Sequence, residues 1–388
     1  MTKFKKCNIN KKEQFLNCFC YIMKVRFKNI KSKCFNNIIS QSKCKNIKKA
    51  KLDNGRIIEA EELETVITEI DFNIISKFYS FDYEILECYY AKKDYLPKEF
   101  IDFILEKYIK KTEYKGVKGK EIEYNLEKAM FNSLYGMTVT QNIRDVVIFD
   151  NESGWIEIPL SQEEILDKLK QEEQKSFLSF SWGIYVTAYA RYNLLINVFN
   201  LDKYVVYCDT DSIKLKQGYS KNIIEKYNKE VEQKIIKASQ DLNIPIEKFA
   251  PKDIKGKSHM LGLFTEETGY TQFITQGAKK YAYISKDDYK IHITVSGVPK
   301  KGAKALKNLN DFKDNFVFSF NDTDKNLLIY NDDMQDFEIT DYKGKKYTVK
   351  EKYGCVLIPT TYELGKSQDY ANLITDNYSN VAVFERRK

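Results

Sequence analysis

Alternating hydrophobic and polar positions mark strands near the start of the chain. Residues 23–27 alternate apolar Met, Val and Phe with Lys and Arg, which is the period of a strand with one buried face. Residues 64–79 indicate a strand that turns into a helix, and residues 81–96 indicate another strand. Residues 204–215 predict a hairpin, and short strands dominate after Tyr270.

Helical periodicity separates these strands. Hydrophobic residues recur at the spacing of one helix face in residues 97–111, and further helices are predicted at 121–135, 182–199 and 220–238. The hydroxyl of Ser220 is a candidate cap for the last of these helices. Its inward face is predicted to carry Ile223, Tyr227, Val231 and Ile235. The polar, acid-rich stretch 138–178 indicates an inserted loop. Because strands and helices mix without regular βαβ alternation, the predicted class is α+β.

Composition narrows the class of protein. The chain has 388 residues, of which 43% are hydrophobic and 30% are charged, as expected for a globular protein with two or three packed units. No apolar run approaches the roughly 20 residues of a membrane span, and the apolar stretch at 15–23 lacks a signal-peptide cleavage site.

Cysteine and histidine usage limits the chemistry. Eight cysteines are scattered without a C-x-x-C pair, and there are only two histidines. This pattern argues against a zinc site and favours reduced thiols in a cytosol-like compartment. Carboxylates and lysines are therefore expected to carry any catalysis.

Positive charge is concentrated at the start of the chain. Residues 1–52 contain 15 Lys and Arg against the single acid Glu13, although the whole chain has a net charge of only +8. Such a segment could form a polyanion-binding face, because lysines and arginines displace counterions from phosphates. A solvated lysine-rich surface explains the charge equally well.

The predicted hairpin carries the first candidate site. Asp209 and Asp211 are two positions apart and are expected on the same face. Because neighbouring carboxylates repel each other, their pairing favours a cation such as Mg²⁺. The alternative is a turn in which Asp and Ser bond backbone amides. An EF-hand is excluded, because its glycine and glutamate positions hold Lys214 and Ser220.

The helix at 121–135 carries the second candidate site. Its helical spacing places Lys128, Asn132 and Tyr135 on one face, a cation, an amide and a ring suited to a nucleotide. The opposite face is predicted to be an apolar stripe of Leu126, Met130, Leu134 and Met137. The alternative is a helix with a solvated lysine that ends at Gly136.

Together the two sites resemble a known family. KAMFNSLYG is followed by YCDTDS, 77 residues later when counted from Asn132 to Asp209. This pair resembles the B and C motifs of family B DNA polymerases. GRIIEA, IDFILEKYIKKTEYKG, WGIYVTAYARY and QGAKKYAY resemble the protein-primed branch, which includes phage and organellar enzymes. The resemblance runs from about Tyr21 to at least Lys301.

The resemblance implies roles for several residues. Asp209 and Asp211 would hold two catalytic Mg²⁺ ions, with Mn²⁺ able to substitute. Lys128 would contact the incoming dNTP, and Asn132 and Tyr135 would shape its pocket.

Three further positions follow from the same resemblance. Lys111, or its neighbour Lys110, would be a second phosphate-binding residue. Lys279 and Tyr281 would contact the primer-template DNA, although Lys279 could also be an ordinary exposed strand lysine.

One family motif is missing from the chain. The A motif, which supplies the remaining metal-binding carboxylate, is expected just upstream of this sequence, and the editing exonuclease still further upstream. The nearest imitation, residues 71–79, lacks the motif's proline and lies too close to the B motif.

The implied fold is the polymerase right hand, with an antiparallel palm sheet, helical fingers and a small β-rich thumb. Its expected parts are a palm insertion with a basic N-terminus (1–95), fingers helices (96–137), a second insertion that wraps downstream template (138–178), a palm with the YCDTDS hairpin (179–297) and a thumb (298–388). The implied function is template-directed DNA synthesis in a host-cell cytoplasm, with a terminal protein as a candidate primer. The alternatives are one subunit of a split polymerase, completed by an N-terminal polypeptide, and an inactive fragment that only binds DNA.

Overall fold

The computed structural model describes residues 4–53, 55–140, 143–150, 153–175, 178–319, 334–340, 344–352, 361–365 and 377–387. The chain divides into two compact units. The first comprises residues 1–267 and 383–388, and the second comprises residues 268–382. Among the described helices, none combines the length and hydropathy that a membrane crossing requires.

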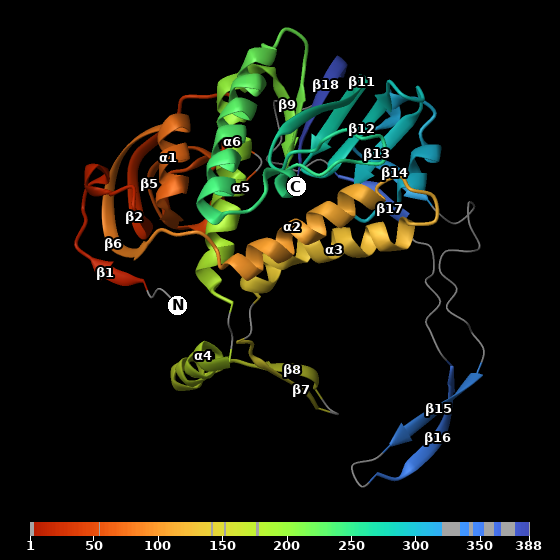
Figure 1. Ribbon diagram of the computed structural model, residues 1–388, viewed down its shortest axis with the longest axis horizontal. Coiled ribbons are helices and arrows are strands. Elements are labelled where there is room, and N and C mark those ends of the chain that lie inside the picture. The colour runs from red at the N-terminus through yellow and green to blue at the C-terminus, as the bar shows by residue number, and fades with distance from the viewer. Residues whose placement is uncertain are drawn as a thin grey trace. The chain divides into compact units, whose positions relative to one another are not determined.

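An antiparallel sheet of six strands opens the first unit (Figure 1). Its strands are β1 (Lys5–Cys7), β2 (Phe19–Ser32), β3 (Cys44–Lys48), β4 (Lys51–Asp53), β5 (Arg56–Thr68) and β6 (Tyr79–Lys92). The order is β1-β6-β2-β5-β3, with β4 also paired to β5. The predicted alternation in β2 is confirmed, because Met23, Val25 and Phe27 are fully buried between less buried basic residues.

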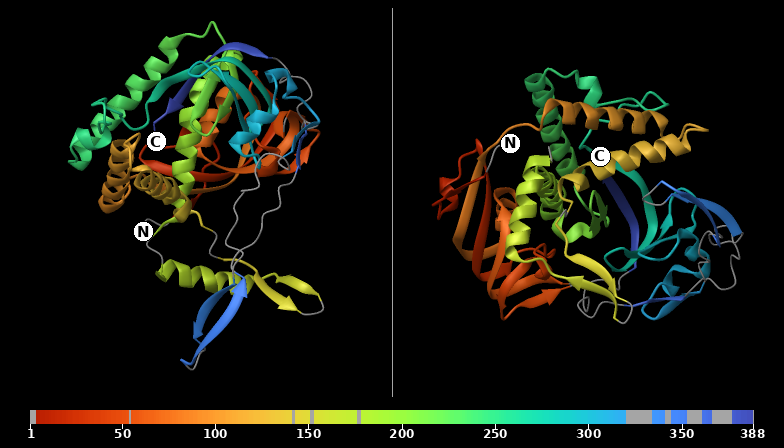
Figure 2. Two further views of the ribbon diagram at one scale, coloured as in Figure 1. Left: turned by 90° about the vertical axis from the view of Figure 1, so that its right-hand side faces the viewer. Right: turned by 90° about the horizontal axis from the view of Figure 1, so that it is seen from below.

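The helix α1 (Glu69–Phe78) joins β5 to β6 and packs against this sheet (Figures 1 and 2). Thr68 caps the helix, since its hydroxyl accepts from the Asp71 amide while the Asp71 carboxylate accepts from the Thr68 amide. Phe72 and Phe78 are buried. The predicted strand-to-helix turn in residues 64–79 is therefore confirmed.

Two helices follow the sheet and lie side by side, α2 (Lys98–Tyr114) and α3 (Glu121–Thr138) (Figure 2). Both predicted helices are confirmed, but α3 does not end at Gly136 and continues to Thr138. The stretch predicted as an inserted loop is instead ordered into secondary structure. It forms the hairpin β7 (Val146–Asp150) and β8 (Gly154–Ile158), followed by the helix α4 (Gln162–Lys175).

A second group of helices and strands completes the first unit. Its elements are α5 (Phe180–Leu201), a 3-10 turn (Asp202–Tyr204), β9 (Val205–Asp209), β10 (Ser212–Leu215), α6 (Lys221–Leu242) and α7 (Ile246–Phe249). The predicted α5 and the predicted β9–β10 hairpin are confirmed. Ser220 precedes α6, but its side chain makes no capping hydrogen bond.

Strands dominate the second unit, as predicted. They are β11 (Phe264–Gly277), β12 (Lys280–Ser285), β13 (Ile291–Val295), β14 (Phe316–Ser319), β15 (Met334–Thr340), β16 (Lys346–Lys352), β17 (Thr361–Leu364) and β18 (Tyr378–Arg386), of which β11 begins and β18 ends in the first unit. A core around Phe312, Phe318 and Leu364 packs these strands together with short 3-10 turns at 300–305 and 309–311. The mixture of helices with antiparallel sheets confirms the α+β class.

Candidate nucleotide and metal site

The β9–β10 hairpin presents its two carboxylates at a tight turn. Asp209 pairs with Ser212 across the strands, and buried Ile213 and Leu215 anchor β10 in the core. The turn residue Thr210 has a φ of 52°, a left-handed conformation that is uncommon for a β-branched residue. The Asp211 amide donates to the Asp209 carbonyl at 2.6 Å. Backbone strain of this kind is retained where the surrounding structure enforces it, and it often marks functional sites.

Hydrogen bonds hold the Asp209 carboxylate in place. Its Oδ1 accepts from the Thr210 hydroxyl at 2.9 Å, and its Oδ2 accepts from the Tyr207 hydroxyl at 3.4 Å. The Ser212 hydroxyl donates to the Asp209 carbonyl at 3.3 Å. The orientation of this carboxylate is therefore set by the hairpin itself.

A buried lysine, which the sequence reasoning missed, lies beside these carboxylates. Lys214 is 3% exposed, and its ammonium donates to the Ser212 hydroxyl at 2.9 Å. Burial lowers the pKa of Lys214, and the charges of Asp209, Glu385 and Asp211 act in the opposite direction. The sequence signal that could have revealed Lys214 is its position between the aliphatic residues Ile213 and Leu215 in a predicted strand.

The C-terminal strand β18 also reaches the hairpin. In the sheet it lies between β10 and β11, and the Arg386 amide donates to the Asp211 carbonyl at 2.8 Å. Val383 and Phe384 are buried, whereas Glu385 is exposed and acts on the Lys214 charge. No local pattern indicates this contact, because β18 is far from the hairpin in sequence.

The two carboxylates fit a hard divalent cation whose remaining ligands come from water and from a substrate. Mg²⁺ in nucleotide-processing enzymes is held by one or two carboxylates together with water and substrate phosphates, and Asp209 and Asp211 supply two. In the part of the chain that the structure describes, no group of three or more His, Cys, Asp or Glu side chains could hold a metal ion.

The second candidate site lies on α3. Lys128, Asn132 and Tyr135 are all exposed there, and the Lys128 ammonium lies 5.7 Å from the centre of the Tyr124 ring. The predicted apolar stripe on the opposite face is only partly correct. Leu126 and Met137 are 56% and 57% exposed, because α3 packs on α2 through other residues, among them Glu127 and Phe131.

Lys111 and Lys110 are distinguished by their contacts. The Lys111 ammonium lies 4.7 Å from the centre of the Phe131 ring of α3 and 5.2 Å from that of Tyr108. The Lys110 ammonium instead pairs with Glu106 at 2.7 Å. Lys111 is thus the lysine held against the helix that carries Lys128, and its role in phosphate binding remains a prediction.

Lys279 and Tyr281 belong to the second unit. Lys279 is exposed and has a φ of 54° in the turn before β12, so it is a turn residue rather than a strand lysine. Its carbonyl accepts from the Ser296 amide, and the Tyr281 ring packs 5.5 Å from that of Phe273. The DNA contact of this pair stays a prediction.

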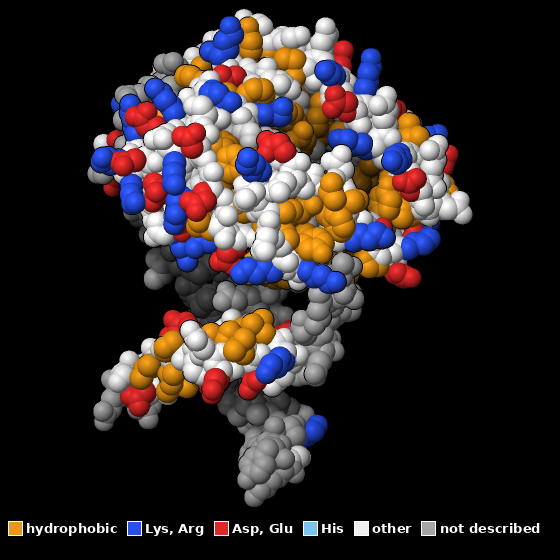
Figure 3. Space-filling view, turned by 90° about the vertical axis from the view of Figure 1, so that its left-hand side faces the viewer, with side chains coloured by type: hydrophobic (Ala, Val, Ile, Leu, Met, Phe, Trp, Pro, Cys, Tyr) orange, Lys and Arg blue, Asp and Glu red, His pale blue; other side chains and the backbone are white. Residues whose placement is uncertain are grey.

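Several basic side chains of the N-terminal segment pair with acids across its own sheet. On β2, Lys24 and Arg26 pair with Glu64 at 3.2 and 2.6 Å, and Lys28 pairs with Glu84 at 3.5 Å. Further pairs join Lys48 to Glu62 and Lys49 to Glu61. Figure 3 shows basic and acidic side chains intermixed on this side of the molecule. The paired residues favour the solvated surface over a polyanion-binding face.

Comparison with known proteins finds partial matches to phage DNA polymerases. No family model matches the chain. It is 30% identical over 159 residues to the DNA polymerase of Bacillus phage B103 and 28% identical over 158 residues to that of Bacillus phage Nf. Phi29 DNA polymerase in complex with primer-template DNA and incoming nucleotides matches 94% of this chain with a TM-score of 0.56 at 18% identity. These matches confirm the predicted resemblance to the protein-primed family B DNA polymerases.

The matches cover only part of the length of each relative. Each phage match spans 40% of this chain and 25% of the relative. In a second Phi29 polymerase structure, bound to primer-template DNA, the match has a TM-score of 0.53 at 16% identity and spans 93% of this chain. The chain thus corresponds to about half the length of the Phi29 polymerase structures. The mixed helices and curled antiparallel sheets of this polymerase fold agree with the predicted α+β right-hand architecture.

Proposed function

We propose that this chain is the nucleotidyl-transfer part of a family B DNA polymerase, which copies a template by adding dNTPs to a primer. The observation that carries the proposal is the β9–β10 hairpin, where a strained turn presents Asp209 and Asp211. Their motif stands in a chain related in sequence to phage DNA polymerases. Solved neighbours of the same fold are complexes with primer-template DNA and nucleotides.

The reaction is the attack of the primer 3′-oxygen on the α-phosphorus of a dNTP. A new P–O bond forms, the bond between the α- and β-phosphates breaks, and pyrophosphate leaves while the 3′-hydroxyl proton passes to solvent. Asp209 and Asp211 would hold Mg²⁺, as two ions or with Mn²⁺ in its place. When bound, these ions supply nucleophile activation and charge stabilisation at the leaving oxygens.

The chain's own residues would position the substrates. Lys128 binds the triphosphate as a compact point charge, and Asn132 and Tyr135 border the nucleotide on the same exposed face of α3. Lys111, resting on Phe131, supports the phosphates from α2. In the second unit, Lys279 and Tyr281 contact the primer-template near its terminus. Catalysis then rests on positioning and electrostatics, which suits a chain with two histidines.

The activity also depends on a further carboxylate, which we propose lies on an N-terminal polypeptide with the A motif, covalently joined or supplied as a separate subunit. A terminal protein is a candidate primer, and the host-cell cytoplasm is the expected site of action for a phage enzyme. The inactive DNA-binding fragment is the alternative, and no observation favours it over the polymerase.

Primer extension tests this proposal. The purified 388-residue chain should bind primer-template DNA in a salt-sensitive way but extend it negligibly. Addition of an N-terminal fragment that ends in the A motif should restore Mg²⁺-dependent synthesis. Asp211→Asn should abolish the restored synthesis, whereas Asp94→Asn, at an exposed position between β6 and α2, should leave it unchanged. Robust extension by the chain alone would show that another acid completes the site, and Glu385→Gln would then be the first variant to examine.

A further inference from the structure

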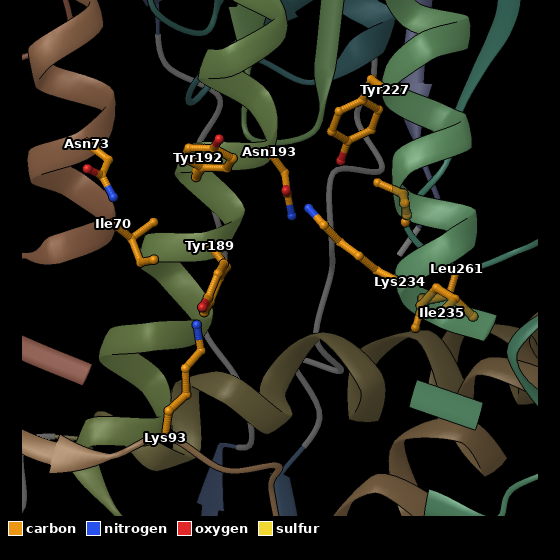
Figure 4. Close-up of a pocket in the computed structure, with 12 residues that line it drawn as sticks. Ile70, Asn73, Lys93, Tyr189, Tyr192, Asn193, Tyr227, Lys234, Ile235 and Leu261 are labelled. Carbon is orange, nitrogen blue, oxygen red and sulfur yellow. The ribbon is translucent and has the colours of Figure 1, made fainter. Parts of the chain in front are cut away.

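A groove of about 630 Å³ lies in the first unit, away from the hairpin and sharing no residue with it. It is bordered by α1, α5 and α6 and by the chain at residues 261–262 (Figure 4). Its polar lining includes Lys93, Lys234, Tyr189, Tyr192, Tyr227 and Asn193. This volume falls in the range of small-molecule binding sites, and a single nucleotide would fit within it.

The charge of the groove lining is positive. Lys93 and Lys234 line it together with no acidic residue, and neither lysine forms a salt bridge with any residue that the structure describes. Figure 4 shows the Lys234 side chain reaching toward Asn193 and Lys93 reaching toward Tyr189. The groove therefore presents two ammonium groups, separated by aromatic rings, to whatever enters it.

Two acids flank the lining residue Ile70 on α1, and the charge of one of them, Glu69, also acts on Lys93. On α1, the Glu69 carboxylate accepts from the Tyr21 amide and the Tyr185 hydroxyl, both at 2.9 Å. The Asp71 carboxylate accepts from the Arg191 guanidinium at 2.9 Å. Internal partners thus hold both carboxylates that flank the lining residue Ile70.

A buried polar atom faces the same space. Tyr227 is 8% exposed, and its hydroxyl makes no hydrogen bond of standard geometry among the described residues, although the Arg386 guanidinium lies close enough to act on it. In Figure 4 this hydroxyl points toward Lys234 and Asn193. Buried polar groups in proteins are nearly always satisfied. A ligand in the cavity would give this hydroxyl the well-aligned hydrogen bond that Arg386 does not make in the structure.

We propose that this groove binds a phosphate-bearing nucleotide unit, distinct from the dNTP at the hairpin. Lys93 and Lys234 contact the phosphate, the Tyr227 hydroxyl donates to an oxygen of the ligand, and the rings of Tyr189 and Tyr192 contact the base. Cationic side chains interleaved with tyrosines are the combination by which proteins hold single-stranded nucleic acid without sequence preference. The unit could come from a free nucleotide or from a single DNA strand that crosses the groove.

Binding and crosslinking on the full chain distinguish these sources. The probes are dTMP and a fluorescent ten-residue oligothymidylate, and the test variant is Lys93→Gln with Lys234→Gln. Its control is Lys237→Gln, a surface lysine of α6 outside the groove lining. We expect the double variant to weaken oligothymidylate binding at least tenfold and to flatten its salt dependence, while the control changes binding less than twofold. Tyr227→Phe, which keeps the ring, should weaken binding severalfold.

Photocrosslinking identifies where the oligonucleotide binds. An oligonucleotide with 5-iodouracil should crosslink to Tyr189 or Tyr192, as mapped by mass spectrometry. Binding of dTMP that is also weakened in the double variant would identify a free nucleotide as ligand, and binding of the strand alone would identify DNA. The proposal is overturned if neither probe binds, if the double variant with unchanged thermal unfolding binds like the control, or if crosslinks map only elsewhere.

Discussion

A buried ion pair between α2 and α3 holds the two helices that carry Lys111 and Lys128. The Lys107 ammonium lies 3.2 Å from Oε2 of Glu127, and the two residues are 7% and 9% exposed. Lys107 also lies 5.0 Å from the centre of the Phe103 ring. At this exposure Glu127 has little water to solvate it, so we expect Lys107→Met to leave its charge buried and unpaired.

The expected cost follows from that desolvation. Removal of one partner of a buried pair typically destabilises a protein by about 3–5 kcal/mol. We expect Lys107→Met to lie at the lower end, about 3 kcal/mol, because Met preserves the aliphatic packing. Adding Glu127→Leu should recover most of this loss, since replacing both partners by apolar residues is often neutral or stabilising.

Urea unfolding followed by fluorescence measures these differences. Trp182 is a suitable reporter because its ring lies 5.7 Å from that of Phe100 on α2, and Trp155→Phe removes the other tryptophan. The matched control is Lys110→Met, whose ammonium pairs with Glu106 in solvent on the same helix and should contribute little. If Lys107→Met lowers the free energy of unfolding no more than Lys110→Met does, the pair does not hold the helices together.

Three other changes test the remaining structure. Lys128→Ala should mainly raise the KM for dNTP in the reconstituted enzyme, by an amount corresponding to about 1.5–3 kcal/mol for a charge-assisted contact. Unchanged KM and kcat would show that Lys128 is a solvated surface lysine without a role in dNTP binding. Replacing residues 145–172 by a short Gly/Ser bridge should leave the core folded, because none of the described residues there is buried, and should speed dissociation from template DNA; loss of the fold would make the insertion structural. Gly183→Ala should destabilise the protein by about 1–3 kcal/mol, because its Cβ would meet the side chains at 138–139, where α3 ends. Gly136→Ala is the control, with open space at its Cβ, and equal urea midpoints for the two variants would contradict the close packing.

Local sequence patterns predicted most of the helices and strands, because each of these elements buries one face. Alternation identified β2, whose Met23, Val25 and Phe27 are buried, and helical spacing identified α2, α3 and α6. The stretch 138–178 was mistaken for a loop because a polar composition is equally compatible with an exposed hairpin and helix. This stretch has nine acidic residues against four basic ones, and Phe149 and Trp155 are exposed. If it wraps the template as predicted, apolar side chains would make the contact.

These local patterns do not predict which segments pair when they are far apart in the sequence. The basic charge of residues 1–52 suggested a binding face, but antiparallel pairing places Glu64 opposite Arg26 and so offsets part of that charge. The apolar stripe assigned to α3 failed in part for the same reason. Its contact with α2 includes the charged Glu127, whose burial is possible only because Lys107 approaches from another helix.

The motif with Asp209 and Asp211 is local in the sequence, whereas its surroundings in the fold are not. Asp209 and Asp211 are set by two adjacent strands and one strained turn, which a short motif can encode. Their electrostatic environment depends on Lys214, buried beneath the turn, and on Glu385, which β18 brings from the other end of the chain. One ammonium offsets part of the repulsion between the aspartates, so the hairpin can close before any cation binds. Under the proposed function, the same ammonium would weaken the binding of a bare divalent cation and would attract the triphosphate that accompanies it. The hairpin would then bind metal and nucleotide together more readily than metal alone.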